Sequence, residues 1–199
     1  MTILRKPPTF GVMPLRFREE RAAQAAARLL HRRGGRMSYM KLLKLLYLAD
    51  RKALVELGQP ITGDLLVAMP KGPVLSNTYN LIQDEPAPDQ PPSYWRTLVS
   101  PPEDYEVRLL VDRVPNDQLS PAQERILDAV FNEFGSWNRW DLVAYTHGLP
   151  EYRDPKGSSV PINLRDILMA EGLSKKDAQA IMNALEADAL MEQLASDSE

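Results

Sequence analysis

The 199-residue chain contains no cysteine and only two histidines, His31 and His147. Without thiols, neither a disulfide framework nor a cysteine-ligated zinc or redox site can form. The two histidines are far apart in the sequence, and neither an HExxH motif nor an aspartate-rich calcium loop accompanies them. We therefore expect no metal ion and no cofactor, and the absence of cysteine suits a reducing cytoplasm.

Long apolar runs are also missing. The stretch "LLKLLYLA" is interrupted by Lys44 and ends before Asp50, whereas a membrane helix needs roughly 18 or more apolar residues. The N-terminal stretch has arginines and prolines where a secretion signal needs an apolar run of about 7 to 15 residues. These absences predict a soluble cytoplasmic protein with no membrane partner.

Acidic residues are scarce near the N-terminus. Residues 1–52 contain 13 Lys and Arg against 3 Asp and Glu, the remainder contains 11 against 24, and the net charge is -3. This polarity favours nucleic acid or an oppositely charged protein at the basic end; alternatively, the two halves neutralise each other within one fold. Nucleic acid is not the partner we expect, because Arg28, Arg32, Arg33 and Arg36 accompany no complete helix-turn-helix reader or RNP-type aromatic motif.

Local signals predict a mainly α (α+β) fold. Helices are expected at residues 19–33, at 39–57 before Gly58, at 121–134, within "SWNRWDLVAYTHGLPEY" and after Ser174. Residues 39–57 are apolar around most of the helix, which predicts a central position in the core. Ser120 and Gln123 form a capping-box signal around Pro121.

Three short segments predict a small antiparallel sheet of about three strands, "LLVAMP", "SYWRTLVS" and "YEVRLLVD". Prolines prevent a continuous helix before residue 18. We therefore predict a proline-rich arm at residues 1–18, a single compact helical domain at 19–194 and an acidic tail at 195–199.

The glycine- and proline-rich stretch "GQPITGDLLVAMPKGPVLSN" at residues 58–77 resembles a phosphate-binding loop only superficially. A P-loop needs lysine where Asp64 stands, and it follows a strand, whereas Gly58 follows a helix. The structural interpretation is a turn, then a strand, then a bend at Gly72, with Pro73 starting the next helix. Lys71 is the residue that this interpretation leaves without a structural role.

His147 is the best candidate for chemistry, since Asp141, Glu151 and Asp154 are near it in sequence. A histidine between a helix end and a Gly-Leu-Pro turn is nevertheless more typical of capping, and helix starts explain Ser76 and Ser120. We therefore assign no catalytic residue and expect the protein not to be an enzyme. Trp137, Trp140, Tyr145 and Tyr152 suit either a binding surface or the core.

Three blocks in order carry a resemblance to a known family. They are "MKLLKLLYLADRKAL", "GQPITGDLLVAMPKGPVLSNTYNLI" and "LSPAQERILDAVFNEFGSWNRWDLVAYTHGLPEY". Together they resemble the Panacea domain, the SocA-like antitoxin family that is also found in phage-associated proteins. The similarity spans about residues 21–152, and the proline-rich arm looks like an addition to the shared pattern.

The resemblance implies a non-enzymatic antitoxin of a toxin–antitoxin system with a role in phage defence, which neutralises the protein toxin of an adjacent gene by direct binding. Two alternatives remain: an adaptor that delivers the toxin to a Clp-type protease, and a DNA-binding regulator that uses the basic N-terminal half. The lack of a credible catalytic constellation, the charge polarity and the extended arm all agree with this interpretation. We expect the partner contacts to come from Arg16, Phe17, Lys71, Tyr79, Trp137, Trp140, His147 and Tyr152.

Overall fold

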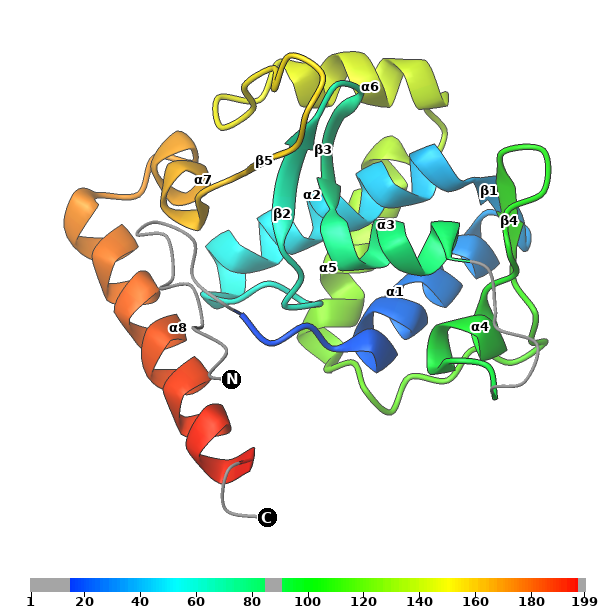
Figure 1. Ribbon diagram of the computed structural model, residues 1–199, viewed down its shortest axis with the longest axis horizontal. Helices are drawn as coiled ribbons and strands as arrows, with labels where there is room; N and C mark the ends of the chain where they lie inside the picture. Colours follow the sequence, from blue (N-terminus) through cyan, green and yellow to red (C-terminus); the bar gives the residue numbers. More distant parts are fainter. Residues whose placement is uncertain (1–14, 85–90, 197–199) are drawn as a thin grey trace, which may run out of the picture.

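A central helix organises the computed structural model, which describes residues 15–84 and 91–196 (Figure 1). This helix, α2 (Tyr39–Leu57), ends at Gly58 in the left-handed conformation. It contacts helices on several sides, namely α1 (Glu19–Arg32), α3 (Ser76–Gln83), α5 (Pro121–Phe134), α6 (Arg139–His147) and α7 (Leu164–Ala170). The mainly α (α+β) class and the central position of residues 39–57 are therefore confirmed.

Two lysines of α2, Lys41 and Lys44, are buried and donate hydrogen bonds to backbone carbonyls. The Lys41 ammonium donates to the carbonyls of Gly135 and Trp137 at 2.6 and 2.7 Å, beyond the end of α5. Lys44 donates to the carbonyl of Pro73 at 2.7 Å. The polar side of α2 therefore satisfies backbone acceptors of neighbouring segments, which a buried helix requires.

Alanine allows α1 to pack closely. Helix α1 contacts α2, α5 and the short helix α4 (Tyr94–Leu98), and its fully buried alanines are Ala22, Ala23, Ala25, Ala26 and Ala27. Small side chains at a helix contact shorten the distance between helix axes. Helix α5 begins with the predicted capping box, since the Ser120 hydroxyl accepts from Gln123 N–H at 3.3 Å and the Gln123 side chain accepts from Ser120 N–H at 2.9 Å.

Two small antiparallel sheets lie against the helices. Strand β1 (Arg36–Ser38) pairs with β4 (Glu106–Arg108), and β2 (Leu66–Met69) pairs on one side with β3 (Gly72–Leu75) and on the other with β5 (Val160–Pro161). The β2–β3 pair is a hairpin with Pro70 and Lys71 at its turn. The predicted helix start at Pro73 is wrong, because Pro73 lies within β3 and α3 begins at Ser76.

The predicted strand "SYWRTLVS" is wrong as well, because Tyr94–Leu98 forms helix α4. The Ser93 hydroxyl accepts from the backbone N–H of Arg96, and the buried Trp95 and Leu98 are spaced as on one face of a helix. Aromatic and β-branched residues in a short segment suggested a strand, but the N-cap and this spacing favour a helical turn. Of the predicted strands, "LLVAMP" forms β2 of the three-stranded sheet, whereas "YEVRLLVD" contains β4, which pairs with β1 in the other sheet.

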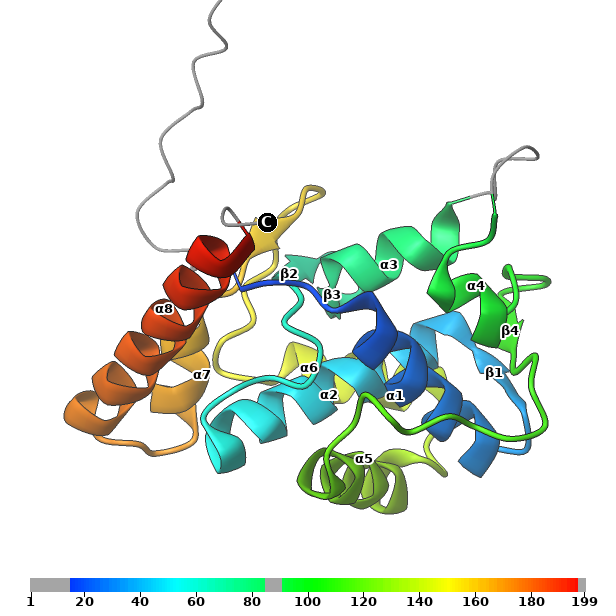
Figure 2. The same cartoon turned by 90° about the horizontal axis from the view of Figure 1, so that it is seen from below.

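Helix α8 (Lys175–Ser196) lies along one edge of the molecule, next to α7 (Figure 2). Its start after Ser174 is confirmed, since the Ser174 hydroxyl accepts from Asp177 N–H at 3.1 Å. Of the predicted arm, residues 1–14 are outside the described part of the chain, and residues 15–18 lead directly into α1. No helix among the described residues is long and apolar enough to cross a bilayer.

Candidate protein-binding site

The acidic residues of the glycine- and proline-rich stretch have structural roles. Buried Asp50, at the middle of α2, accepts hydrogen bonds from the backbone N–H groups of Ile61 and Thr62 at 3.0 and 3.1 Å and from the Thr62 hydroxyl. Burial raises the pKa of Asp50 to about 7, against the lowering effect of its hydrogen bonds with Thr62. These bonds hold the turn against α2.

Asp64 caps the start of α3, although it precedes this helix by more than ten residues in the sequence. Its carboxylate accepts from the backbone N–H groups of Asn77 and Thr78, each at 2.8 Å, and from the Thr78 hydroxyl at 2.7 Å. A carboxylate at this position satisfies free N–H groups and suits the positive end of the helix dipole. The motif therefore connects α2 to α3, and no phosphate site is needed to explain it.

The segment that precedes α1 packs against the backbone at Gly63. Its φ is +65°, and a Cβ at this position would collide with the carbonyl oxygen of Arg16. The backbone N–H of Arg18 also donates to the carbonyl of Thr62 at 2.9 Å. Arg16, which is exposed, and Phe17, which packs on the core, therefore lie across this turn.

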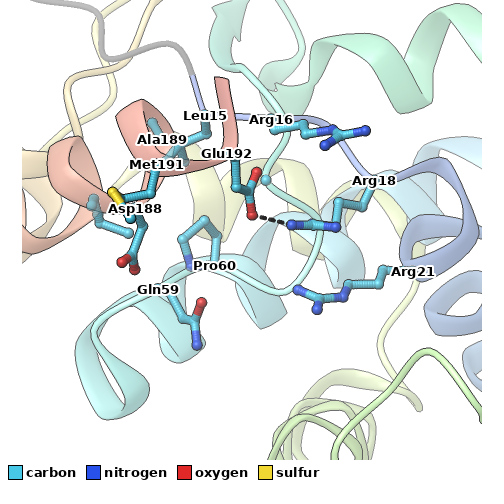
Figure 3. Close-up of a pocket in the computed structure, with 12 residues that line it drawn as sticks. Leu15, Arg16, Arg18, Arg21, Gln59, Pro60, Asp188, Ala189, Met191 and Glu192 are labelled. Atoms are coloured by element: carbon cyan, nitrogen blue, oxygen red, sulfur yellow. Dashed lines mark hydrogen bonds and ion pairs between the residues drawn. The ribbon is translucent and has the colours of Figure 1, made fainter. Parts of the chain in front are cut away.

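A cavity of about 290 Å³ lies between this segment, the turn and α8 (Figure 3). Arg16, Arg18 and Arg21 approach it from one side, and Asp188 and Glu192 of α8 approach it from the other. Arg18 and Glu192 form an ion pair. Two of the predicted contact residues, Arg16 and Phe17, thus belong to a region separate from the other six.

A second group of predicted residues meets at the tip of the β2–β3 hairpin. The Tyr152 hydroxyl donates to the carbonyl of Met69 at 3.1 Å, and the His147 ring stacks on Tyr152 with ring centres 4.6 Å apart. Lys71 is exposed at the adjacent turn. This arrangement brings Lys71, His147 and Tyr152 together on one corner of the molecule.

Gly72 makes this corner compact. Its φ is +90°, and a Cβ there would lie 2.7 Å from Lys44 Nζ, 2.9 Å from Thr146 Oγ1 and 3.0 Å from His147 Cδ2. Burial lowers the pKa of Lys44 to about 7. Burial also lowers the pKa of His147, and the nearby Lys44 charge acts in the same direction. Both effects favour the neutral form of the His147 imidazole, which stacks on Tyr152.

The two tryptophans of the third sequence block have different environments. Trp137 packs edge-on against Phe134 and Tyr145, with ring centres 5.1 and 5.6 Å apart, and its carbonyl accepts from Lys41. Trp140 is 54% exposed, and the Arg139 guanidinium lies 5.3 Å from the centre of its ring. Trp137 therefore completes the packing between α5 and α6, whereas Trp140 faces solvent.

Tyrosines surround the start of α2 and α6. Burial raises the pKa of Tyr39, and Tyr79, Tyr105 and Arg139 are all close enough to contribute electrostatically. The Tyr39 and Tyr105 rings have centres 6.4 Å apart, and Tyr39 N–H donates to the carbonyl of Tyr105 at 3.0 Å. Tyr105 is 68% exposed. Tyr79, predicted from sequence, thus lies near the same residue, Tyr39, as two residues that were not predicted, Tyr105 and Arg139.

The backbone at Tyr105 is unusual. Asp104 and Tyr105 have φ values of +51° and +64°, and backbone hydrogen bonds of 2.8 and 2.9 Å between Glu103 and Glu106 close the two-residue turn. Such turns favour Asn or Asp followed by Gly, because both central residues have positive φ. A bulky residue there costs energy, and strain of this kind is concentrated at functional sites. The sequence "PPEDYE" predicted a turn, but it did not predict which residue of the turn would be exposed.

Helix α6 joins these two groups of residues. Its first residue, Arg139, is close to Tyr39, and its last, His147, stacks on Tyr152. Figure 1 shows α6 across the top of the molecule, with the β2–β3 hairpin beside it and the β1–β4 pair beyond its other end. We call this surface the α6 face and define it by Lys71, Tyr79, Tyr105, Arg139, Trp140, His147 and Tyr152.

Ion pairs connect the basic N-terminal half to the acidic remainder. Arg28 binds both carboxylate oxygens of Asp128, at 3.0 and 2.7 Å, and Arg32 approaches Asp128 at 2.8 Å. The hydrogen bond that Asp128 accepts from Arg28 is the main cause of the lowered pKa of Asp128. Arg36 pairs with Glu106, and Arg51 pairs with Glu151 at 2.7 Å. The charge polarity of the sequence is thus largely compensated within the fold at these positions.

In the described ranges, residues 15–84 and 91–196, no three His, Cys, Asp or Glu side chains are grouped so that they could hold a metal ion. Arg28 and Arg32, considered for nucleic acid, line a cavity of about 390 Å³ with Arg113 and His31, but both also bind Asp128. We therefore take the α6 face as the candidate protein-binding site.

A family model described as "Antitoxin SocA-like, Panacea domain" matches residues 42–152, which is more than half of the chain. The chain belongs to this family. No curated protein and no solved structure matches it. The Panacea match covers most of α2, the Gly58–Asn77 stretch, α5 and α6, so it includes every residue of the α6 face.

Membership of the Panacea family supports an antitoxin role for the chain and suggests a role without catalysis. An antitoxin family also implies a toxin as the general kind of partner. The match leaves α1, α7 and α8 outside its limits. In this Panacea protein, Arg16 and Phe17 are likewise outside the matched residues.

Proposed function

We propose that this protein is an antitoxin that binds a cognate protein toxin directly, in the cytoplasm, through the α6 face. The toxin is the product of an adjacent gene, and the binding domain spans residues 19–194. The observation that carries the proposal is the exposed Tyr105 and Trp140, with the partly exposed Arg139 beside Trp140, inside the family-matched residues. Tyr, Trp and Arg contribute most of the binding energy at many protein interfaces.

The fold holds these side chains in place before a partner arrives. The turn at residues 103–106 fixes Tyr105, the Arg139 guanidinium packs on Trp140, and Tyr152 stacks on His147. Binding then immobilises few additional side chains, so less entropy is lost on association. The surface connects several elements, as a specific interface of roughly 1,200 to 2,000 Å² requires.

Co-expression with the adjacent gene tests the function. The wild-type chain should restore growth of cells that express the toxin, and the two proteins should purify as a complex. An unchanged toxin half-life in these cells supports neutralisation by binding, whereas a shortened half-life supports delivery to a Clp-type protease. A chain that neither binds the toxin nor protects the cells disproves the proposed function.

Two substitutions test the surface. Trp140→Ala and Tyr105→Ala should each weaken toxin binding by at least tenfold, about 1.4 kcal/mol, as expected for a central interface aromatic. Leu110→Ala is the matched control, because Leu110 is 52% exposed but outside the α6 face. Isothermal titration gives the affinities, and circular dichroism confirms the fold. Wild-type affinity in both aromatic variants would place the interface elsewhere without disproving the antitoxin role.

A further inference from the structure

The arginine-lined cavity of about 390 Å³ lies between the second half of α1, α5 and residues 113–119, which lead into α5. Figure 2 shows this leading segment as the green trace that passes alongside α1 before α5 begins. We call it the α1–α5 cavity, and its charged and imidazole lining residues are Arg28, His31, Arg32, Arg113 and Asp128. None of its described lining residues belongs to the α6 face, so the cavity is separate from the proposed toxin contact.

The wall formed by residues 113–119 is fixed to α1. Gln24, which has no exposed area, donates to the Asp117 carboxylate at 2.8 Å and accepts from the backbone N–H of Gln118 at 3.0 Å. Leu119 N–H donates to the carbonyl of Asn116 at 3.3 Å, and the Leu119 side chain is buried. The wall is therefore ordered before a ligand binds, which reduces the entropy lost on binding.

The carboxylate of Asp128 in the cavity wall is already bound on both oxygens. Its Oδ1 accepts from Arg28 Nε at 3.0 Å and lies 2.8 Å from Arg32 Nη1, and its Oδ2 accepts from Arg28 Nη2 at 2.7 Å. Glu124, beside the cavity, approaches Arg28 at 3.5 Å and accepts from the Asn116 amide at 2.9 Å. Two carboxylates thus face two arginines, Arg28 and Arg32, and their charges balance.

Arg113 supplies a further positive charge. Its exposed guanidinium lines the cavity, and within residues 15–84 and 91–196 no hydrogen bond, ion pair or ring contact engages it, the neighbouring Asp112 included. The His31 side chain lines the same cavity and is likewise without a partner in that part of the chain. Three arginines and two carboxylates therefore leave one uncompensated positive charge, and it is on Arg113.

Arg32 is held in a fixed orientation with donors to spare. Its guanidinium lies over the Phe131 ring, 4.9 Å from the ring centre, and its Nη2 donates to the Asn132 side chain at 2.6 Å. A guanidinium has five N–H donors, so the contacts with Asp128 and Asn132 leave others unused. The cavity thus combines a free cation with additional oriented N–H groups.

We propose that the α1–α5 cavity binds a phosphate group through Arg113, His31 and the remaining N–H groups of Arg32. A planar guanidinium matches two oxygens of a phosphate, and an imidazole offers at least one N–H in either protonation state. Val114, Pro115 and Leu119 line the same cavity and present an apolar surface to the organic part of a phosphate monoester. The volume lies within the roughly 300 to 1,000 Å³ of small-ligand sites.

Isothermal titration of the full chain in phosphate-free buffer tests the proposal. AMP should bind saturably, whereas adenosine, which lacks the phosphate, should not, and the AMP affinity should fall as salt rises. Inorganic phosphate distinguishes the two sources of the group, since tighter binding of AMP assigns a monoester and equal affinities assign free phosphate. No saturable binding of AMP or inorganic phosphate, or equal binding of adenosine and AMP, overturns the proposal.

A matched pair of variants tests the assignment to Arg113. Arg113→Gln removes the uncompensated charge and should weaken AMP binding by about tenfold, as expected for the loss of charge-assisted hydrogen bonds. Arg125→Gln, at an exposed arginine of α5 that is not among the lining residues, should bind AMP as the wild type does. Circular dichroism confirms the fold of both variants. Unchanged affinity in Arg113→Gln, or equal losses in both variants, overturns the assignment.

A short single-stranded oligonucleotide gives the last comparison. Binding of the oligonucleotide without binding of AMP or inorganic phosphate would assign Arg113 to an extended nucleic-acid surface and would overturn the cavity as a phosphate site. Toxin neutralisation should be the same for Arg113→Gln as for the wild type, because Arg113 is not part of the α6 face. Failure of the antitoxin role and failure of the phosphate site are therefore separate results.

Discussion

The two alanine-rich helices, α1 and α8, are similar in composition and different in environment. In α1 the alanines are fully buried, whereas in α8 several face solvent. The charges differ in the same way, because α1 begins with Glu19 and Glu20 and ends with His31 and Arg32, in agreement with its dipole. Helix α8 has three of its four acids in its second half and no base in its last turn. Alanine content alone therefore does not distinguish a helix buried in the core from one that presents a face to solvent.

The largest difference between the two helices should appear when an alanine is enlarged. Ala26→Leu, at a side chain with no exposed area, should lower the free energy of unfolding by about 1 to 3 kcal/mol, because the α1 contacts have no room for extra methylene groups. Ala184→Leu, on the outer side of α8, should change it by less than about 0.5 kcal/mol. Urea unfolding gives both values. Equal losses would show that α8 is packed as tightly as α1.

A smaller difference should appear when the ion pairs are removed. Asp128→Asn takes away the two-oxygen bond to Arg28 and the contact with Arg32, and it should cost about 1 kcal/mol at pH 7. The pKa of Asp128 is lowered in the fold, so its contribution is present above the unfolded pKa near 4 and is lost as pH falls through the folded value. The gap between wild type and variant should therefore close in acid. A gap that persists at pH 2 contradicts this assignment.

The smallest effect is expected at the ion pair that connects α8 to the start of α1. Glu192→Gln should lower the free energy of unfolding by less than about 0.5 kcal/mol, because the side chains of Arg18 and Glu192 are each 35% exposed. Thermal melts in low and high salt measure it. Glu103→Gln, which breaks the more exposed pair with Arg108, is the control. A loss at Glu192 as large as that at Asp128 would mean that α8 is held by charge rather than by its buried apolar residues, Ala178 and Leu185.

Much of the fold was predictable from sequence because its signals are local. The central helix ends at Gly58, and the Ser120–Gln123 capping box forms, since each depends on residues within a few positions of each other. The family was also recognisable, because its motifs occur in a fixed order along the sequence, and recognising that order requires no knowledge of tertiary contacts. Helix α4 was missed, since its aromatic and β-branched residues favour a strand until Ser93 is recognised as its cap.

The candidate site was only partly predictable, because its residues meet through tertiary contacts. Lys71 was expected from one motif and His147 and Tyr152 from another, but their meeting depends on how the hairpin packs against α6. Tyr105 and Arg139 were missed, since exposure and positive φ are properties of the folded backbone. Trp137 and Trp140, three residues apart, could not be separated into a packed and an exposed side chain without the fold.

Gly63 has an effect that reaches both ends of the described chain. Because it lacks a side chain, the backbone of residues 15–18 rests on the turn after α2. That position aligns Arg18 with Glu192 of α8 and sets the direction in which α1 starts. The absence of a Cβ at Gly63 thus allows the N-terminal segment, the family-matched core and the C-terminal helix to pack together at one point.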